Sequence, residues 1–409
     1  MPHGWQLEKI ETLCDRIQSG GTPLSSIKEY YSGDIPFVKI EDLTNSKKNL
    51  YSTNSKITSE GLKNSSAWLV PEDSLLYAMY GSIGSIAINK IPVATNQAIL
   101  GIILDKQKAD LEFIYYALSN AKNSLMYHAK QSTQANLTAK IVKEFEISVP
   151  SLQEQKSIAS VLSTVDSGIQ KSDEAIEKTE RLKQGLMQRL LTKGLGHDRF
   201  VFREELGCEI PEEWEVVRLG KIAEINKESR DPAEKPDSSF MYIDIESVEN
   251  GSGLIKGVKE VFGAAAPSRA RRVVHTGDVI MSTVRPYLKA FALVPPEFDN
   301  QICSTGFAVL TTTEKTTPKY ILYSLFSDNV IDQCNRMMVG GQYPALNSTQ
   351  VSKINLPLPL VNEQERIAEI LSSVDEKLSL EKKRRERLER IKKGLMDVLL
   401  SGKKRVSVN

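Results

Sequence analysis

One short run concentrates side chains that could contact a polyanion. The run Ser268–Arg272 (SRARR) places Arg269, Arg271 and Arg272 close to His275. An arginine guanidinium can donate two parallel hydrogen bonds to N7 and O6 of guanine, or to a phosphate. A solvated basic loop would have the same composition, so both interpretations stay open.

A second run mixes hydroxyls with cations. The run Ser282–Lys289 (STVRPYLK) contains Thr283, Arg285, Tyr287 and Lys289. Hydroxyl groups and lysines commonly bind phosphates, whereas arginine also reads base edges. We predict contacts with nucleic acid here, with a solvated loop as the alternative.

Polar residues beside strand-like runs supply the candidates in the other half of the chain. A polar turn follows the last helix of each half, and the two turns occupy equivalent places. These regions contribute the remaining candidate contacts: Lys39, Tyr80, Ser82, Asn96, Gln97, Gln131, Thr133, Gln342 and Tyr343.

Motifs for catalysis are missing or incomplete. An adenine methyltransferase needs an Asn/Asp-Pro-Pro-Tyr/Phe loop, and Val294–Phe298 (VPPEF) lacks the leading amide. Tyr80–Ser85 (YGSIGS) is rich in glycine but has neither a suitably spaced acidic residue nor a GK[ST] ending. A tight turn or a close approach to a DNA backbone is the better interpretation of that run. The helicase-like letters of Asp173–Ile176 (DEAI) lie in a helical segment without an upstream phosphate loop.

Histidines and cysteines show no metal-binding spacing. No CxxC pair occurs, which fits packed or idle thiols in a reducing cytoplasm. We therefore predict no metal site and no catalytic residue. The residues concerned are His3, His128, His197, His275, Cys14, Cys208, Cys303 and Cys334.

Composition is that of an ordinary globular protein, with 40% hydrophobic and 26% charged residues and a net charge of +1. No segment is a polycation, so binding to nucleic acid would use local patches or a partner that supplies more charge. No apolar run approaches a membrane span, and the first residues lack a signal pattern.

A long repeat organises the chain. Residues 150–194 align without a gap to 359–403 at an offset of 209, with 18 of 45 positions identical. The same offset pairs Trp5 with Trp214. We infer a duplicated plan of globular domain and helix, with boundaries at 1–150, 151–210, 211–358 and 359–409.

The repeated element is predicted to be a long helix. Ser151 with Glu154, and Asn362 with Glu365, fit capping boxes, and Gly194 and Gly402 fit helix ends. Apolar residues recur at steps of three and four, which predicts a coiled-coil seam that weakens in the middle. The seam positions are Ile158, Leu162, Val165, Ile169, Ile176, Leu182, Leu186 and Leu190, and then Ile367, Leu371, Val374, Leu378, Leu388, Ile391, Leu395 and Leu399.

Two helices of ~60 Å, each with one apolar stripe, are expected to pair with each other in antiparallel orientation. Gly185 and Gly394 recur inside them, which suggests close backbone contact with a neighbour, or simply inheritance from the duplication. The basic run 381–393 is interpreted as a solvated helix face rather than a DNA patch.

The globular halves read as strands followed by one helix, which favours an α+β fold. Predicted strands are 34–40, 74–80, 85–89 and 97–104 in the first half, and 240–245, 277–282, 289–294 and 306–310 in the second. The predicted helices are 111–129 and 319–337. Between these anchors the halves diverge, as expected if one frame carries two different surfaces.

Over essentially its whole length, the chain resembles the specificity subunits of type I restriction–modification systems. The resemblance rests on the duplicated plan, on the helix starts, on GLM..LL near the helix ends, and on several runs in the globular halves. Those runs are Ser19–Pro23 (SGGTP), Gly33–Leu43, Met79–Ile88, Ala94–Ile102, Gly277–Leu293 and Cys303–Leu310.

The resemblance implies two α/β target recognition domains, each reading half of a split DNA sequence, in a pseudo-twofold arrangement. It implies helices that set the spacer and dock two methyltransferase subunits, with restriction/translocase subunits completing a cytoplasmic complex. It implies no cofactor in this chain, since S-adenosylmethionine belongs to the methyltransferase partner and ATP and Mg to the restriction partner.

Two other classes stay open at this point. A self-contained nuclease or methylase is disfavoured by the missing motifs, and turnover by the purified chain would establish it. A coiled-coil scaffold for proteins alone is disfavoured by diverged domains on a preserved frame.

Overall fold

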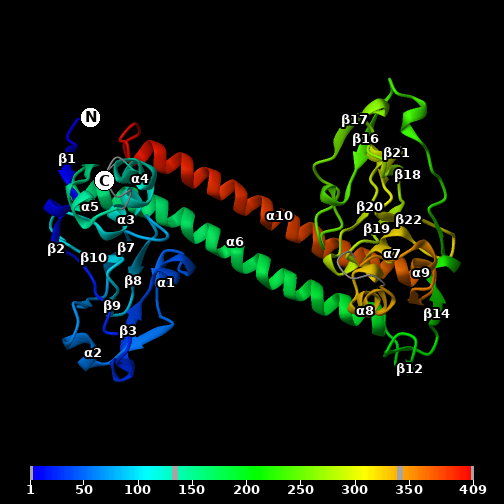
Figure 1. The fold of residues 1–409 in the computed structure, drawn as a ribbon, viewed down its shortest axis with the longest axis horizontal. Helices are drawn as coiled ribbons and strands as arrows, with labels where there is room; N and C mark the ends of the chain where they lie inside the picture. The colour runs from blue at the N-terminus through cyan, green and yellow to red at the C-terminus, as the bar shows by residue number, and fades with distance from the viewer. Residues whose placement is uncertain (1–2, 131–136, 339–343, 407–409) are drawn as a thin grey trace. The chain divides into compact units, whose positions relative to one another are not determined.

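The computed structural model describes residues 3–130, 137–338 and 344–406 (Figure 1). The chain forms two compact units. Unit 1 comprises residues 1–173 and 383–409, and unit 2 comprises residues 174–382. Each unit therefore contains one globular half together with a part of each long helix.

Unit 1 is built on two sheets and a short strand pair. A five-stranded sheet has the order β2 (Cys14–Ser19), β10 (Ile99–Leu104), β7 (Ser74–Ala78), β8 (Ile86–Asn89), β4 (Asn49–Leu50). A four-stranded sheet has the order β5 (Ser55–Ile57), β3 (Tyr31–Val38), β9 (Val93–Thr95), β6 (Leu69–Val70). The pair joins β1 (Gln6–Lys9) to β11 (Glu146–Val149).

Unit 2 repeats most of this topology with a different sequence, but its first sheet has no counterpart of β4. One sheet has the order β15 (Ala223–Ile225), β22 (Phe307–Thr312), β19 (Val279–Ser282), β20 (Phe291–Leu293). The other has the order β17 (Lys259–Phe262), β16 (Ser239–Ile243), β21 (Gln301–Ser304), β18 (Ala270–Val274). The pair of β14 (Glu215–Arg218) with β23 (Asn355–Leu358) matches β1 with β11, and a hairpin of β12 (Phe200–Arg203) and β13 (Cys208–Pro211) is added.

One parallel strand pair marks the equivalence of the two units. In unit 1, β3 pairs in parallel with β9, and in unit 2, β16 pairs in parallel with β21. Both pairs lie in otherwise antiparallel four-stranded sheets. The duplication therefore extends into the globular halves, although their sequences have diverged.

The helices predicted at 111–129 and 319–337 are each broken in two. Unit 1 contains α3 (Leu111–Asn120) and α4 (Lys122–Lys130), and unit 2 contains α7 (Pro318–Leu325) and α8 (Asp328–Met337). The single-helix prediction was wrong in unit 2 because Ser327 is extended and its side chain caps a new helix by accepting from the Val330 amide. The short helices are α1 (Ile40–Asn45), α2 (Ser59–Lys63), α5 (Ala139–Glu144) and α9 (Ser348–Ser352).

The two long helices are α6 (Leu152–Lys193) and α10 (Val361–Leu399). Ser151 accepts a hydrogen bond from the Glu154 amide at 3.4 Å, as the capping motif predicts. The Asn362 cap was wrong, because α10 begins one residue earlier and takes Asn362 into its first turn. Gly194 and Gly402 follow the helix ends with positive φ.

Ion pairs define the direction in which the helices run within each unit. In unit 1, Asp166 pairs with Lys392 at 2.7 Å and Asp173 with Arg385 at 2.5 Å. The position on α10 falls by seven residues as the position on α6 rises by seven, so the segments are antiparallel. In unit 2, Glu180 with Lys382 and Lys183 with Asp375 give the same result.

The predicted seam is only partly correct. Ile158, Leu162, Ile367 and Leu371 are fully buried, and Thr179 is 4% exposed. Leu182 and Ile391, predicted as seam residues, are instead 51% and 41% exposed. Because an α-helix turns once in 3.6 residues, the buried stripe passes through Thr179 and carries Leu182 to the outside.

The recurring glycines were predicted to make a close backbone contact, and that prediction does not hold within the described chain. A Cβ added at Gly185 or at Gly394 would meet no described atom within 4 Å. Each glycine is exposed and lies three residues after Leu182 or Ile391. Unit 2 therefore carries one exposed patch, Leu182 with Gly185, and unit 1 carries its repeat equivalent, Ile391 with Gly394.

A buried glutamine ties each long helix to its globular half. Gln155 accepts from the Asp110 amide and donates to the carbonyls of Lys108 and Pro150. Its repeat equivalent Gln364 accepts from the Thr317 amide and the Thr316 hydroxyl, and donates to the carbonyls of Lys315 and Pro359. The sequence showed that this glutamine recurs but not what it binds.

A tyrosine–aspartate–lysine bracket also recurs in both units. In unit 1, Tyr116 of α3 donates to Asp166 at 2.6 Å, and Asp166 pairs with Lys392. In unit 2, Tyr323 donates to Asp375 at 2.8 Å, and Asp375 pairs with Lys183 at 2.6 Å. Burial, and to a smaller extent the neighbouring Asp166, raises the pKa of Tyr116 well above its ordinary range, so its phenol stays a donor. Each bracket joins the globular half to both long helices.

No helix in the described ranges is both long and apolar enough to cross a lipid bilayer.

Candidate nucleic-acid interface

Five of the seven candidates of unit 1 come together at the ends of three strands. Lys39 follows β3, Tyr80 and Ser82 follow β7, and Asn96 and Gln97 follow β9. We call this set edge 1. The sequence predicted these residues one by one, and the parallel pairing of β3 with β9 brings them to one place.

Backbone contacts show how closely the three loops of edge 1 approach each other. The Asn96 amide donates to the Val38 carbonyl at 3.4 Å, and the Met79 amide donates to the Ala98 carbonyl at 2.8 Å. A Cβ added at Gly81 would lie 3.1 Å from Cδ1 of Ile40. Glycine is therefore needed where the loop after β7 crosses the start of α1.

Side chains of several chemical types project from edge 1. Lys39 and Gln97 are exposed, and Tyr80 is 37% exposed. Gln97 Oε1 accepts from the Thr22 hydroxyl at 2.5 Å, whereas Asn96 Oδ1 accepts from the Ala98 amide. An ammonium group, a phenol and two carboxamides offer both donors and acceptors, which is the chemistry needed to read base edges.

Unit 2 forms an equivalent set at the ends of the equivalent strands. Thr283 and Arg285 follow β19, and Arg269 precedes β18. The Thr283 amide and hydroxyl both donate to the Gly306 carbonyl, at 2.8 and 2.9 Å. The Thr305 amide donates to the Arg269 carbonyl at 2.8 Å. The structure therefore brings Arg269, Thr283 and Arg285 together.

Two residues of this set were missed from the sequence. Asp244 follows β16 as Lys39 follows β3, and Thr305 follows β21 as Asn96 follows β9. The signal for Asp244 was the local match of Lys39–Asp42 (KIED) with Asp244–Ser247 (DIES), each after a strand. We call Asp244, Arg269, Thr283, Arg285 and Thr305 edge 2.

Four other predicted contacts of unit 2 do not belong to edge 2. The Arg272 guanidinium donates to Asn226 Oδ1 at 2.6 Å and to the Phe307 carbonyl, and burial lowers its pKa. Arg271 pairs with Asp231 at 2.9 Å. Lys289 donates to the Phe326 carbonyl at 2.9 Å, and Tyr287 lies on the 3₁₀ turn Pro286–Leu288 with 43% of its surface exposed. Arg272 and Lys289 serve the fold, so we leave both out of edge 2.

The remaining four predicted contacts, Gln131, Thr133, Gln342 and Tyr343, lie outside the described residues. The chain resumes beside edge 2, where the Arg285 amide donates to the Pro344 carbonyl at 3.1 Å. Arg285 itself has a left-handed backbone, with φ of 48°.

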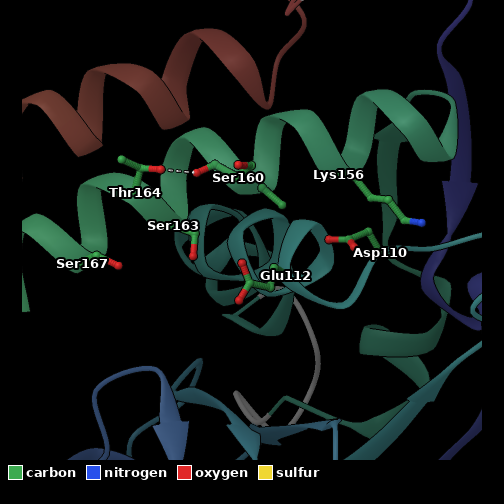
Figure 2. A pocket seen from close by; sticks show the side chains of 8 residues that line it. Asp110, Glu112, Lys156, Ser160, Ser163, Thr164 and Ser167 are labelled. Carbon is green, nitrogen blue, oxygen red and sulfur yellow. Dashed lines mark hydrogen bonds between the residues drawn. The ribbon is translucent and has the colours of Figure 1, made fainter. Parts of the chain in front are cut away.

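A hollow of ≈ 370 Å³ in unit 1 does not resemble a catalytic site (Figure 2). Ser160, Ser163, Thr164 and Ser167 line it from α6, opposite Glu112 of α3. The Thr164 hydroxyl donates to the Ser160 carbonyl at 2.8 Å, so it bonds its own helix. Asp110, a further lining residue, caps α3 by accepting from the Phe113 amide.

The cysteines and the possible metal-binding groups give no sign of a catalytic or metal site in the described residues. The four cysteines are free, and burial raises the pKa of Cys303 and of Cys334 to about 12. Such thiols are poor nucleophiles at neutral pH. Across residues 3–130, 137–338 and 344–406, no group of three or more His, Cys, Asp or Glu residues is arranged to hold a metal ion.

Comparison with known proteins identifies the class. Residues 2–181 and residues 211–390 each match the family described as type I restriction modification DNA specificity domain. The chain therefore belongs to this family and contains its domain twice. It is a DNA sequence-specificity subunit, a non-catalytic part of type I restriction–modification complexes, as the sequence resemblance implied.

Individual relatives agree with this assignment. The type I restriction enzyme MjaVIII specificity subunit of Methanocaldococcus jannaschii is 26% identical over 423 residues, covering 99% of this chain and 94% of that protein. The MjaIX specificity subunit of the same organism is 33% identical over 237 residues, covering 57% of this chain and 54% of that protein.

Solved structures share the fold. The crystal structure of the type I restriction–modification system S subunit from M. genitalium has a TM-score of 0.61 at 18% identity, covering 97% of this chain and 96% of that one. The α+β prediction, with two globular halves and long antiparallel helices, is confirmed.

Proposed function

We propose that edge 1 and edge 2 are the two surfaces through which the chain reads DNA, one half of a split target each. The observation that carries this proposal is structural equivalence. Both edges form where a parallel strand pair and a neighbouring strand end, one edge per unit, and their side chains differ. Two equivalent platforms with different chemistry suit two different half-sites.

Each edge has few positively charged side chains, and this limits its affinity for DNA. Edge 1 has one lysine and edge 2 has two arginines, in a chain of net charge +1. Affinity for DNA scales with the number of phosphates neutralised. We therefore propose that tight binding requires partner subunits that contribute further phosphate contacts.

We propose that two methyltransferase subunits are those partners, and that they dock on the two exposed patches of the long helices. Leu182 with Gly185, and Ile391 with Gly394, are repeat equivalents, and each glycine leaves open space for the backbone of a partner helix. Two equal patches suit two copies of one partner. Restriction subunits would complete the complex, with S-adenosylmethionine held by the methyltransferase and ATP and Mg by the restriction subunit.

A binding titration tests the proposal. Fluorescence anisotropy with a duplex carrying the target should show weak binding by the purified chain at moderate salt. The reconstituted complex should bind tightly and discriminate against a scrambled duplex. Equal specific affinity with and without the methyltransferase would refute the requirement for partners.

Substitutions in the patches test the docking site. Gly185→Leu and Gly394→Leu should leave the fold of the free chain intact, because both positions are open. Each should remove one methyltransferase copy, measured as assembly mass by native mass spectrometry. Gln184→Leu, next to Gly185 and also exposed, is the matched control. Full occupancy in both glycine variants would place the partner elsewhere.

A further inference from the structure

Lys39 and Asp244 occupy the same structural place in the two units. Lys39 is the first residue after β3, and Asp244 is the first residue after β16. These strands are the first members of the two parallel pairs, β3 with β9 and β16 with β21. Each precedes a short helical turn, α1 after Lys39 and the 3₁₀ turn Ile245–Ser247 after Asp244. The two positions therefore present their side chains from equivalent corners of the two edges.

The neighbouring contacts confirm this equivalence. The Lys39 amide donates to Asp42 Oδ2 at 2.8 Å, and the Asp244 amide donates to the Ser247 hydroxyl at 3.3 Å, so the third residue caps the turn in both units. The next residue is isoleucine in both, but the two isoleucines meet different loops, the loop after β7 in unit 1 and the loop after β21 in unit 2. Ile40 lies near Gly81, and Ile245 lies near Gly306.

The first residue of the turn carries opposite charge in the two units. Lys39 is exposed and ends in an ammonium group, which donates hydrogen bonds and accepts none. Asp244 is half-buried, and its carboxylate accepts only. In the described part of the chain, both hydrogen bonds to this carboxylate, from the Ser247 amide and hydroxyl, use Oδ1. Oδ2 accepts no hydrogen bond from the described residues, so it is the carboxylate oxygen left for a ligand.

We propose that this position determines base specificity, with opposite sign in the two half-sites. In the major groove a lysine suits acceptor atoms such as O6 and N7 of guanine, whereas an aspartate suits an exocyclic amino group, N4 of cytosine or N6 of adenine. Edge 1 then requires an acceptor, and edge 2 requires an amino group, at the base that each position faces. This inference rests on the proposed function.

The geometry at Asp244 allows a clean substitution. Asp244→Asn keeps Oδ1 as the acceptor that caps the turn, and asparagine is a good capping residue. It replaces Oδ2 by an NH₂ donor, so the change in hydrogen bonding is confined to the atom that faces a base. Asparagine pairs with N6 and N7 of adenine. The substitution should therefore shift the preferred base rather than unfold the turn.

The experiment uses the complete complex. Cells expressing the chain with its methyltransferase partner are analysed by methylome sequencing, which reports the methylated motif. Asp244→Asn should change the preferred base at one position of one half-site by about 10-fold or more, the fold-change expected of one bidentate contact. Lys39→Gln should change one position of the other half-site. Glu246→Gln and Glu41→Gln, exposed neighbours two residues on, are the matched controls and should leave the motif unchanged.

The outcomes separate the two levels of the argument. An unchanged motif in Asp244→Asn, or the same change in Glu246→Gln, would overturn the inference while leaving the proposed function standing. A wild-type motif without two parts would instead refute the proposed function. If Asp244→Asn abolishes methylation, binding to duplexes with each base in turn replaces the methylome, and Asp244→Glu should retain the wild-type preference. Loss of that preference in Asp244→Glu would also overturn the inference.

Discussion

Unit 1 and unit 2 bind their long helices in one way, but the contacts that their sheets make with the neighbouring elements differ. The glutamines Gln155 and Gln364 make matching hydrogen bonds with the backbone at the start of α3 and α7. The tyrosine–aspartate–lysine brackets also match. These contacts hold each globular half at a defined place, so they are the shared frame.

The sheet that contains β4 in unit 1 and the sheet that contains β20 in unit 2 contact their neighbouring helices through different groups. In unit 1, Lys48 beside β4 is 14% exposed, and its Nζ lies 3.0 Å from both Glu112 and Tyr116 and 3.3 Å from Ser163. In unit 2, Gly253 bridges to Ala292 of β20, and a Cβ there would meet Leu322 at 3.3 Å. Unit 1 thus holds this side of its sheet with a charged side chain, whereas the contact in unit 2 is a backbone pairing with a glycine packed close to α7.

The shared frame should respond equally in both units, and most strongly. Gln155→Leu and Gln364→Leu each leave buried backbone groups without partners, so each should lower the free energy of unfolding of its own unit by about 3 kcal/mol or more. Chemical denaturation followed by hydrogen exchange in each unit measures this. Gln184→Leu, on the exposed face of α6, should be near neutral. A loss in one unit only would show that the frame is not shared.

The fastening of the sheets should respond in unit 1 alone. Lys48→Met keeps the length of the side chain but removes its bonds to Glu112 and Tyr116, so we expect unit 1 to lose about 1–2 kcal/mol. Unit 2 should not change. Lys90→Met removes an ion pair with Asp73 on the more exposed side chain just after β8 and serves as the control, with a smaller loss. If both lysine variants lower the free energy of unfolding of unit 1 equally, Lys48 does not hold the sheet more strongly than an ordinary surface ion pair does.

The acidic residue before each glutamine has different partners in the two units. Glu154 is 2% exposed and is paired by Arg405 through two bonds of 2.5 and 2.7 Å. Glu363 accepts from the Trp214 indole at 3.0 Å and from the Leu195 amide at 2.9 Å as well as meeting His197. Arg405→Ala leaves the buried carboxylate of Glu154 without its cationic partner. His197→Ala leaves the carboxylate of Glu363 with two hydrogen-bond donors, the Trp214 indole and the Leu195 amide.

We therefore expect Arg405→Ala to lower the melting temperature of unit 1 more than His197→Ala lowers that of unit 2. Hydrogen exchange at rising temperature, followed separately in the two units, gives both values. The reverse order would mean that Glu154 finds another donor when Arg405 is removed.

The smallest expected effect depends on pH. Burial would raise the pKa of Asp173, but hydrogen bonds from Lys47 and Arg385 outweigh it and hold the pKa below its ordinary value of 3.8. A depressed pKa contributes stability that is present above the unfolded pKa and lost as the pH falls through the folded one. Asp173→Asn should therefore destabilise unit 1 at pH 7, and its difference from wild type should shrink below about pH 4. A difference that stays constant down to pH 2.5 would contradict the ion pair.

Much of the frame could be predicted from sequence because it is local and written twice. The periodicity of α6 and α10 and the matching residues at the offset of 209 are visible in one chain. The path of the buried seam could not be predicted from the spacing of apolar residues. An α-helix turns once in 3.6 residues, so alternating steps of three and four do not follow the buried face closely, and Leu182 and Ile391 lie on the outside.

The edges were predictable only in part, because they depend on strand pairing across long separations. Lys39 and Asn96 meet through β3 and β9, and Asp244 and Thr305 meet through β16 and β21, about 60 residues apart in each case. A basic run is easy to notice, which drew the prediction to Arg272, although its guanidinium bonds the fold. Asp244 was overlooked because an acidic residue does not suggest DNA.

Hydrogen exchange of the assembled complex on half-altered DNA would show whether each edge reads its own half-site. The complex is compared on the full target, on a duplex with one half-site scrambled, and on a duplex with the other scrambled. Scrambling one half-site should remove protection at residues 39–42, 80–82 and 96–98 while leaving 244–247, 283–285 and 305–306 protected, and scrambling the other should do the opposite. Loss of protection in both units from either change, or protection of neither edge on the full target, would contradict the account.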